Sequence, residues 1–234
     1  MLRYLLTVRR EINVLVALAL GILLLKVFWL NTVPEWFSWG AEIGEIIDRL
    51  CASILSSYLF FLIVVHLKSE KDKENLNPYV FSRVQRIVGD CTSQLSDFQN
   101  ASGISLSLDN LQRQEVETAF RGIGPNAQAP LILGFRGNYA NWLQYMNYHR
   151  TRTIQVIEKL YRKITFLDSR LVQNLADLDD CSHFGSIEFL AGNSIPVNNT
   201  NLEAWASSFY DYCVIVRRLN EYANEKLSIY RPGL

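Results

Sequence analysis

The densest group of side chains that could do chemistry lies near residue 180. Its members are Asp177, Asp179, Asp180, Cys181 and His183. Residues three or four positions apart share one face of a helix, so Asp179 or Asp180 could bind a metal ion together with His183. Two ligands do not make a metal site, and the sequence offers no obvious second pair. The simpler interpretation is a solvated helix end or a break between two helices, so we predict no metal site.

The common catalytic motifs are missing from the sequence. It contains no GxxxxGK[ST] or GxGxxG phosphate-binding motif, no HExxH zinc motif and no GxSxG nucleophile motif. We therefore predict a protein without catalytic residues, catalytic activity or a cofactor. An enzyme that uses Asp179, Asp180 and His183 is the alternative.

The four cysteines also give no sign of chemistry. They are far apart and form no CxxC pair: Cys51, Cys91, Cys181 and Cys213. A disulfide framework is not expected in a helical chain of 234 residues. We predict free thiols in a reducing compartment.

Aromatic and basic side chains that could bind nucleic acid are interleaved between residues 139 and 163. The rings are Tyr139, Trp142, Tyr145, Tyr148 and His149, and the bases are Arg150, Arg152, Lys159, Arg162 and Lys163. These bases alternate with the expected core face of a helix, which is typical of a solvated side. The formal net charge of the whole chain is zero. We therefore predict no nucleic-acid partner.

Two apolar runs precede this part of the chain, Ile12 to Leu30 and Leu50 to Leu67. At roughly 1.5 Å per helical residue each spans about 27–29 Å, close to the hydrocarbon thickness of a bilayer. Backbone groups in lipid must be satisfied internally, so both runs are predicted to be helices. A cleaved signal peptide is not expected, because no small-residue cleavage site follows the first run. Residues 1–67 are thus predicted to form a transmembrane hairpin.

Charges beside these runs predict the topology. Bases flank the hairpin at both ends, whereas the turn is acidic: Arg3, Arg9, Arg10, Lys68, Lys71 and Lys73, against Glu35, Glu42, Glu45 and Asp48. The positive-inside rule then places both termini in the cytoplasm of a multi-pass protein of the cell (inner) membrane. The aromatic residues near the turn fit the outer interface: Phe28, Trp29, Trp36, Phe37 and Trp39. Residues 40–48 are expected to extend the second helix outward.

Polar and small residues inside the apolar runs could shape a pore or a tight helix pair. Lys26 could gate a pore, or could reach the outer headgroups toward Glu45 or Asp48. In a pore, Ser53, Ser56 and Ser57 would line or gate the path with Lys26. Pairs of small residues four apart could instead bring the two helices of the hairpin together: Ala17 with Gly21, Ala52 with Ser56 and Ser53 with Ser57.

The remaining chain is predicted to be helical. A charged linker, residues 68–76, leads to a helix start at Asn77 and Pro78. Apolar residues then recur at helical spacing in ranges 77–100, 108–120, 138–166, 168–190 and 200–228, with Asp168 and a Thr200–Glu203 capping box as helix starts. No segment alternates as a strand does. The fold is predicted to be all-α, with an antiparallel cytoplasmic bundle of four main helices and one short helix in residues 77–234.

One loop of the bundle, residues 121–137, is rich in glycine and proline but also carries Leu131, Ile132, Leu133 and Phe135. An apolar run in such a loop either plugs the bundle or forms a contact surface, and burial is the more common outcome.

The order of parts resembles that of uncharacterised bacterial membrane proteins with two transmembrane helices and a cytoplasmic helical bundle. The segments Tyr58–His66 and Leu167–Ser182 look like sequences of that group. The resemblance implies no activity for any residue.

These features predict a membrane-anchored helical interaction or regulatory module without catalytic activity. Its partners would be the lipid bilayer and either another protein or further copies of itself. The alternative is an oligomeric membrane effector or channel that the bundle gates, a layout used by bacterial defence systems.

Overall fold

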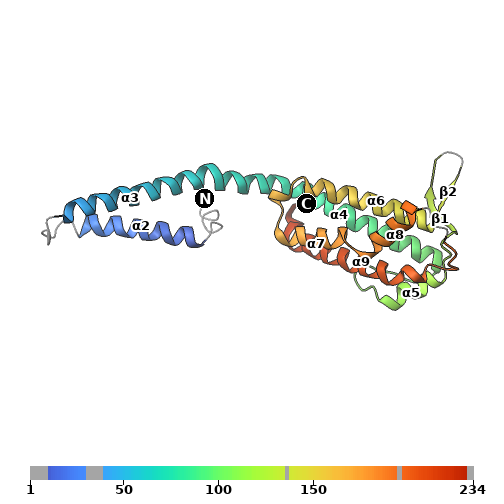
Figure 1. Cartoon of the computed structure of the whole chain (residues 1–234). Coiled ribbons are helices and arrows are strands. Elements are labelled where there is room, and N and C mark those ends of the chain that lie inside the picture. The colour runs from blue at the N-terminus through green and yellow to red at the C-terminus, as the bar shows by residue number, and fades with distance from the viewer. Residues whose placement is uncertain (1–9, 30–38, 135–136, 194–196, 231–234) are drawn as a thin grey trace. The chain divides into compact units, whose positions relative to one another are not determined.

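The computed structural model describes residues 10–29, 39–134, 137–193 and 197–230. These residues are mostly helical, which confirms the all-α class (Figure 1). The chain divides into two compact units, residues 1–75 and residues 76–234. Several residues used to predict topology lie outside the described ranges, namely Arg3, Arg9, Glu35, Trp36 and Phe37.

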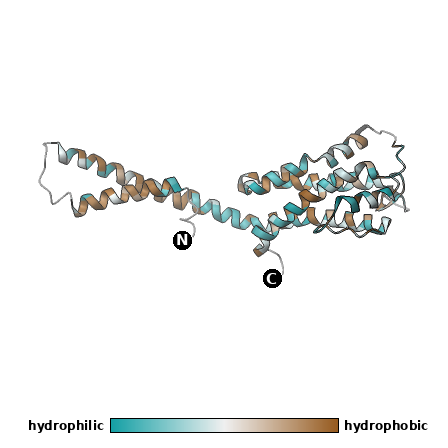
Figure 2. Ribbon diagram, turned by 90° about the horizontal axis from the view of Figure 1, so that it is seen from below, coloured by the Kyte–Doolittle hydropathy of each residue, from teal (hydrophilic) through white to brown (hydrophobic). Residues whose placement is uncertain are grey.

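The first unit is a pair of helices that lie side by side, α2 (Arg10–Phe28) and α3 (Gly40–Phe60), followed by a π-helical turn, η2 (Phe61–His66). Both helical segments are long and apolar enough to cross a membrane. Their apolar side chains are exposed around the outside, as with Leu18 and Ile46, which are 62% and 61% exposed (Figure 2). Helix α3 begins at Gly40, so the predicted helical extension of the second apolar run over residues 40–48 is confirmed.

The helices of this hairpin meet along a narrow seam. The facing residues repeat every three or four positions and are half-buried or buried: Val16, Ala19, Leu23 and Lys26 on α2, and Asp48, Cys51, Leu55, Tyr58 and Leu62 from the second segment. This spacing is that of knobs packed into holes. The predicted contact through pairs of small residues is wrong, because Gly21, Ala52 and Ser56 are exposed on other faces. Larger apolar side chains and polar contacts set the register instead.

The second unit is a helical bundle. Its helices are α4 (Leu67–Ser102), α5 (Arg113–Arg121), α6 (Trp142–Tyr161), α7 (Ser169–Asp179), α8 (Ser182–Asn193) and α9 (Glu203–Tyr222), with short turns η3 (Ile164–Phe166), η4 (Ala223–Leu227) and η5 (Ser228–Tyr230). Helix α9 packs against α5, α7 and α8. Phe98 lies at the centre of the core, and its ring is 4.6 Å from that of Phe120 and 5.1 Å from that of Phe209.

The predicted helix start at Asn77 is wrong. Helix α4 begins at Leu67, so the charged linker is helical and Pro78 lies inside the helix. Lysine and glutamate are good helix formers, and Lys73 pairs with Glu70 at 2.8 Å one turn away. Proline costs the helix a backbone hydrogen bond and strains the preceding turn, so it marks a place where α4 bends most easily.

Two short strands were not expected from the sequence. Strands β1 (Gln128–Ile132) and β2 (Tyr139–Asn141) pair in antiparallel fashion, with an irregularity in the register. Gly134 and Gly137 have φ angles of 85° and 70°, the left-handed backbone that glycine adopts without strain. Five and three residues are too few for a clear alternation, so the pattern was missed.

Helix starts were predicted with mixed success. Asp168 caps α7 by accepting a hydrogen bond from the Arg170 amide at 2.9 Å, as predicted. Helix α6 begins at Trp142 rather than at Asn138, because Asn141 and Gln144 form a reciprocal capping box. The expected box at Thr200–Glu203 is wrong, since Leu202 occupies the N-cap without a side-chain hydrogen bond.

Candidate functional site

The lysine of the first apolar helix is held inside the hairpin. Lys26 Nζ donates hydrogen bonds to the Asp48 carboxylate and to the Gly44 carbonyl, the latter at 3.0 Å. A Cβ at residue 44 would lie 3.5 Å from Lys26 Cε, an ordinary van der Waals distance, so the lysine chain passes directly over this part of α3. The Lys26 side chain is only 22% exposed. Its charge is therefore matched by Asp48, one of the two carboxylates that the sequence suggested.

A second polar contact joins α2 and α3 at the other end of the seam. The Tyr58 hydroxyl donates to Asn13 Oδ1 at 2.8 Å. In lipid, where water does not compete, hydrogen bonds between helices stabilise their association. The two contacts therefore pin α2 to α3 near both ends. The three serines suggested for a pore, Ser53, Ser56 and Ser57, lie on exposed faces of α3.

The structure separates the acidic residues near 180 from His183. Asp179 and Asp180 are exposed at the end of α7, whereas His183 is 1% exposed. The His183 ring lies 5.3 Å from that of Phe209 and 5.5 Å from that of Tyr212. Burial lowers the pKa of His183 to about 3, so its imidazole is neutral. Among the described residues, no three His, Cys, Asp or Glu side chains could hold a metal ion together.

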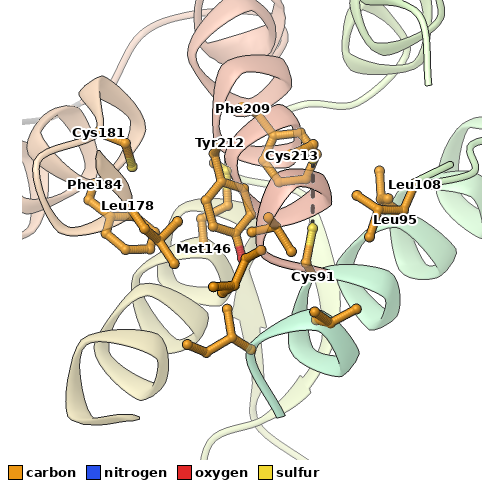
Figure 3. Close-up of a cluster of buried hydrophobic side chains, with 14 of the residues drawn as sticks. Cys91, Leu95, Leu108, Met146, Leu178, Cys181, Phe184, Phe209, Tyr212 and Cys213 are labelled. Atoms are coloured by element: carbon orange, nitrogen blue, oxygen red, sulfur yellow. Dashed lines mark hydrogen bonds between the residues drawn. The ribbon is translucent and has the colours of Figure 1, made fainter. Parts of the chain in front are cut away.

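Two thiols that are distant in sequence meet in the core. Cys91 of α4 and Cys213 of α9 point toward one another, with their sulfur atoms 3.8 Å apart (Figure 3). Gln94 Nε2 lies 3.4 Å from the neighbouring Tyr212 hydroxyl. Burial raises the pKa of the Cys213 thiol well above its usual range. All four cysteines are free and buried, which confirms the prediction of unpaired thiols.

Helices α4 and α6 share a polar edge that sequence reasoning missed. Arg152 pairs with Asp90 at 3.0 Å, and the Tyr145 hydroxyl donates to the Asp97 carboxylate. Burial raises the pKa of Asp90, although Arg152 and Arg86 act in the opposite direction. His149 is buried beside them, and burial followed by the charge of Arg152 lowers its pKa to about 4. Residue 97 lies beside residue 145, and residue 90 lies beside residue 152, so α4 and α6 run antiparallel along this edge.

The apolar loop forms the tip of the β-hairpin. Ile132 and Leu133 are 58% and 42% exposed, so the expectation that they plug the bundle is wrong. Leu131 is partly buried against the core, and Phe135 lies outside the described residues. Gly134 and Gly137 have positive φ angles, which favour a tight reversal of the chain between the two strands.

A pocket lies next to this hairpin, between the start of α6 and the end of α8. Its volume is about 420 Å³, and its lining has five apolar side chains and three amides: Leu143, Ile187, Leu190, Ala191 and Val197, with Asn141, Gln144 and Asn147. Asn141 and Gln144 already bind each other's backbone in the capping box. The pocket contains no ionisable side chain, so it offers shape and apolar contact rather than acid–base chemistry.

No protein-family model matches the chain, and neither the curated proteins nor the solved structures include a match to it.

Proposed function

We propose that the protein is a membrane-anchored helical interaction module without catalytic activity. The observation that supports this proposal is the pairing of two different surfaces in one chain. Residues 10–28 and 40–66 expose apolar side chains around most of their circumference, as lipid-facing helices do. The bundle buries its own apolar side chains but exposes Ile132 and Leu133 at a hairpin tip. Exposed apolar groups of this kind often mark contacts with another protein.

The proposed topology has both termini in the cytoplasm and the hairpin turn outside the cell membrane. It rests on the bases at Arg3, Arg9 and Arg10, on those after Leu67, and on the acidic turn. The ion pair of Lys26 with Asp48 supports the pairing of the two helices within the hairpin, because it joins the single lysine of the first run to the acidic end of α3. The bundle would then face the cytoplasm, where a soluble or membrane partner could reach its hairpin tip.

Site-specific photo-cross-linking in intact membranes tests the contact. A photoreactive amino acid at Leu133 is expected to give one discrete adduct, whereas the same residue at exposed Gln114 of α5 gives none. Resistance of the protein to alkaline extraction tests the anchor separately. The proposal fails if the protein is extracted by alkali or if Leu133 gives no adduct in its native host cells.

An oligomeric channel gated by the bundle is the second candidate. It is favoured by the outward position of Ser53, Ser56 and Ser57, whose hydroxyl groups do not contact α2 and could meet another hairpin. Lys26 fits this candidate less well, because it already binds Asp48 and Gly44. Cross-linking of cysteines placed at Ser53 and Ser57 distinguishes the two. A ladder ending at a defined oligomer, together with ion leakage that Lys26→Leu alters, supports the channel; a monomer excludes it.

A further inference from the structure

The cations of the bundle are unevenly paired. Within the described residues of 76–230, most lysines and arginines bind a carboxylate or a backbone carbonyl: Arg113, Arg121, Arg150, Arg152, Arg170, Arg217, Arg218 and Lys226. Five form no such contact: Arg83, Arg86, Lys159, Arg162 and Lys163. All five belong to α4, to α6 or to the two residues that follow α6. We call these five residues the basic strip.

Helical spacing places the strip on two facing edges. On α4, Arg83 and Asp90 are seven residues apart and thus share a face, with Arg86 between them. On α6, Arg152 and Lys159 are also seven residues apart. The Asp90–Arg152 ion pair, at 3.0 Å, joins the two edges. Because α4 and α6 run antiparallel, Arg83 and Lys159 fall opposite each other.

Carboxylates of the two helices neutralise the strip only in part, because Asp90 acts on Arg86 as well as on Arg152. Asp90 is already held by Arg152 and is only 8% exposed. Glu158 lies six residues beyond Arg152, which turns it about 120° away from the edge that faces α4 at about 100° per residue. The exposed cations Lys159 and Lys163, together with the partly compensated Arg86, therefore present a net positive surface. Such a surface is complementary to an anionic partner that carries several charges.

The short distance along the chain between the strip and the second apolar run favours one kind of anionic partner. Arg83 follows Leu67, the end of the second apolar run, by 16 residues, or about 24 Å of helix. Pro78 lies between them and weakens α4 where bending would let the strip approach a nearby surface. Because the bundle is joined to the hairpin, the membrane that holds the hairpin is present near the strip at a high effective concentration, whatever else the cell contains. Phosphate groups of lipids bind both lysine and arginine side chains.

We propose that the basic strip binds the anionic phospholipid headgroups of the membrane that holds the hairpin. The proposal rests on the proposed membrane insertion. Binding would dock the α4–α6 side of the bundle on the lipid surface and leave the β-hairpin tip to a protein partner. Nucleic acid fits the strip less well, because the rings beside it are each covered by an arginine: Tyr79 by Arg83 at 4.9 Å and Tyr148 by Arg152 at 5.4 Å. Neither ring is free for base stacking.

The test uses the full chain reconstituted in vesicles. A fluorophore is attached at Ser82→Cys, an exposed position beside the strip, and its quenching by headgroup-bound spin labels is measured. The native cysteines are all buried and do not compete for the label. Vesicles of phosphatidylcholine alone are compared with vesicles that also contain phosphatidylglycerol. A label at Gln114→Cys on α5 reports on the rest of the bundle.

We expect quenching at residue 82 only with phosphatidylglycerol, and we expect salt to remove it. The triple variant R86Q/K159Q/K163Q should lower the docked-to-free ratio by roughly 100-fold, since each cation near an anionic surface contributes about fivefold. The matched variant R121Q/R170Q/R218Q removes the same charge from cations that are paired elsewhere. This matched variant should lower the docked-to-free ratio much less than the strip variant does.

Three results would overturn the proposal. The first is equal quenching in both kinds of vesicle. The second is an equal loss in the two triple variants, which would indicate net charge rather than the strip. The third is strip-dependent binding of a single-stranded RNA without any response to phosphatidylglycerol. Alkaline extraction of the same vesicles separates these results from failure of membrane insertion, because a protein that is not inserted leaves the vesicles before any docking is measured.

Discussion

The hairpin and the bundle are both built from α-helices, but they place their apolar and polar side chains in opposite ways. In the hairpin, apolar side chains such as Leu18 point outward and polar contacts such as Lys26–Asp48 lie in the seam. In the bundle, Phe98 and its neighbours fill the interior, and most ion pairs lie on the surface. The difference is the one expected if the hairpin lies in lipid, as proposed, because burial of apolar groups is favoured in water but gains nothing in lipid. Substitutions that remove apolar side chains should therefore change the free energy of unfolding by different amounts in the hairpin and in the bundle.

The largest effect is expected in the bundle core. Phe98 is fully buried, and its ring contacts those of Phe120, Trp142 and Phe209. Phe98→Ala should lower the free energy of unfolding by about 3–5 kcal/mol, because it leaves a cavity among aromatic rings. Denaturant unfolding of the full chain in mild detergent, followed by tryptophan fluorescence, measures this loss.

A hairpin substitution gives the matching control. Leu18 is 62% exposed on α2, so Leu18→Ala should change the free energy of unfolding by less than about 0.5 kcal/mol. If Leu18→Ala were as costly as Phe98→Ala, the outside of the hairpin would be packed against protein rather than lipid. The contrast drawn between the two units would then be wrong.

Acid should destabilise the bundle through its two buried histidines. Burial lowers the pKa of His149 to about 4 and of His183 to about 3, from an ordinary value near 6.5. Between these values the unfolded chain binds protons that the folded chain does not. Stability is thus complete above about pH 6.5 and falls as the pH drops toward 4, by roughly 1.4 kcal/mol per pH unit for each histidine.

Unfolding measured from pH 7 to pH 4 checks this dependence. The variant His149→Gln should reduce the slope by the contribution of one histidine, roughly 1.4 kcal/mol per pH unit. Asp90 acts in the opposite direction, because burial raises its pKa and its protonation favours the folded state at acid pH. The difference between wild type and variant removes the contribution of Asp90. A slope that His149→Gln leaves unchanged would mean that this histidine is as accessible in the folded chain as in the unfolded one.

A smaller effect is expected at the polar contacts of the hairpin. Tyr58→Phe removes the hydrogen bond to Asn13 and should weaken the pairing of α2 with α3 by about 0.6–2 kcal/mol. Unfolding of the full chain by titration with a denaturing detergent measures this change. Ser56→Ala, on an exposed face of α3, is the control and should have no effect within a single hairpin. A larger effect of Ser56→Ala would favour the oligomeric alternative.

The sequence reveals features that depend on neighbours in the chain. Helical periodicity, the apolar runs and the Asp168 cap all arise within a few residues, and all were predicted. The seam of the hairpin was not, because Ala17 and Gly21 pack as easily outward as inward and the register depends on a distant helix. The polar edge was missed for the same reason: Asp90 and Arg152 are far apart in sequence, and neither belongs to a motif. Pro78 led to the wrong prediction of a helix start, because the free-energy cost of a proline inside a stable helix is smaller than the stabilisation that the surrounding packing provides.

The smallest effect on stability, and the clearest test of the contact surface, is expected at the β-hairpin tip. Ile132 and Leu133 are exposed, so replacing both by aspartate should change the free energy of unfolding by less than about 0.5 kcal/mol for each residue. Leu131 packs against the core, and Leu131→Asp should cost several times more. A tip that serves as a contact surface should lose its photo-cross-linked partner in the double variant, while the bundle stays folded. If the adduct at residue 133 persisted in a folded double variant, the tip would merely lie near the partner and would not bind it.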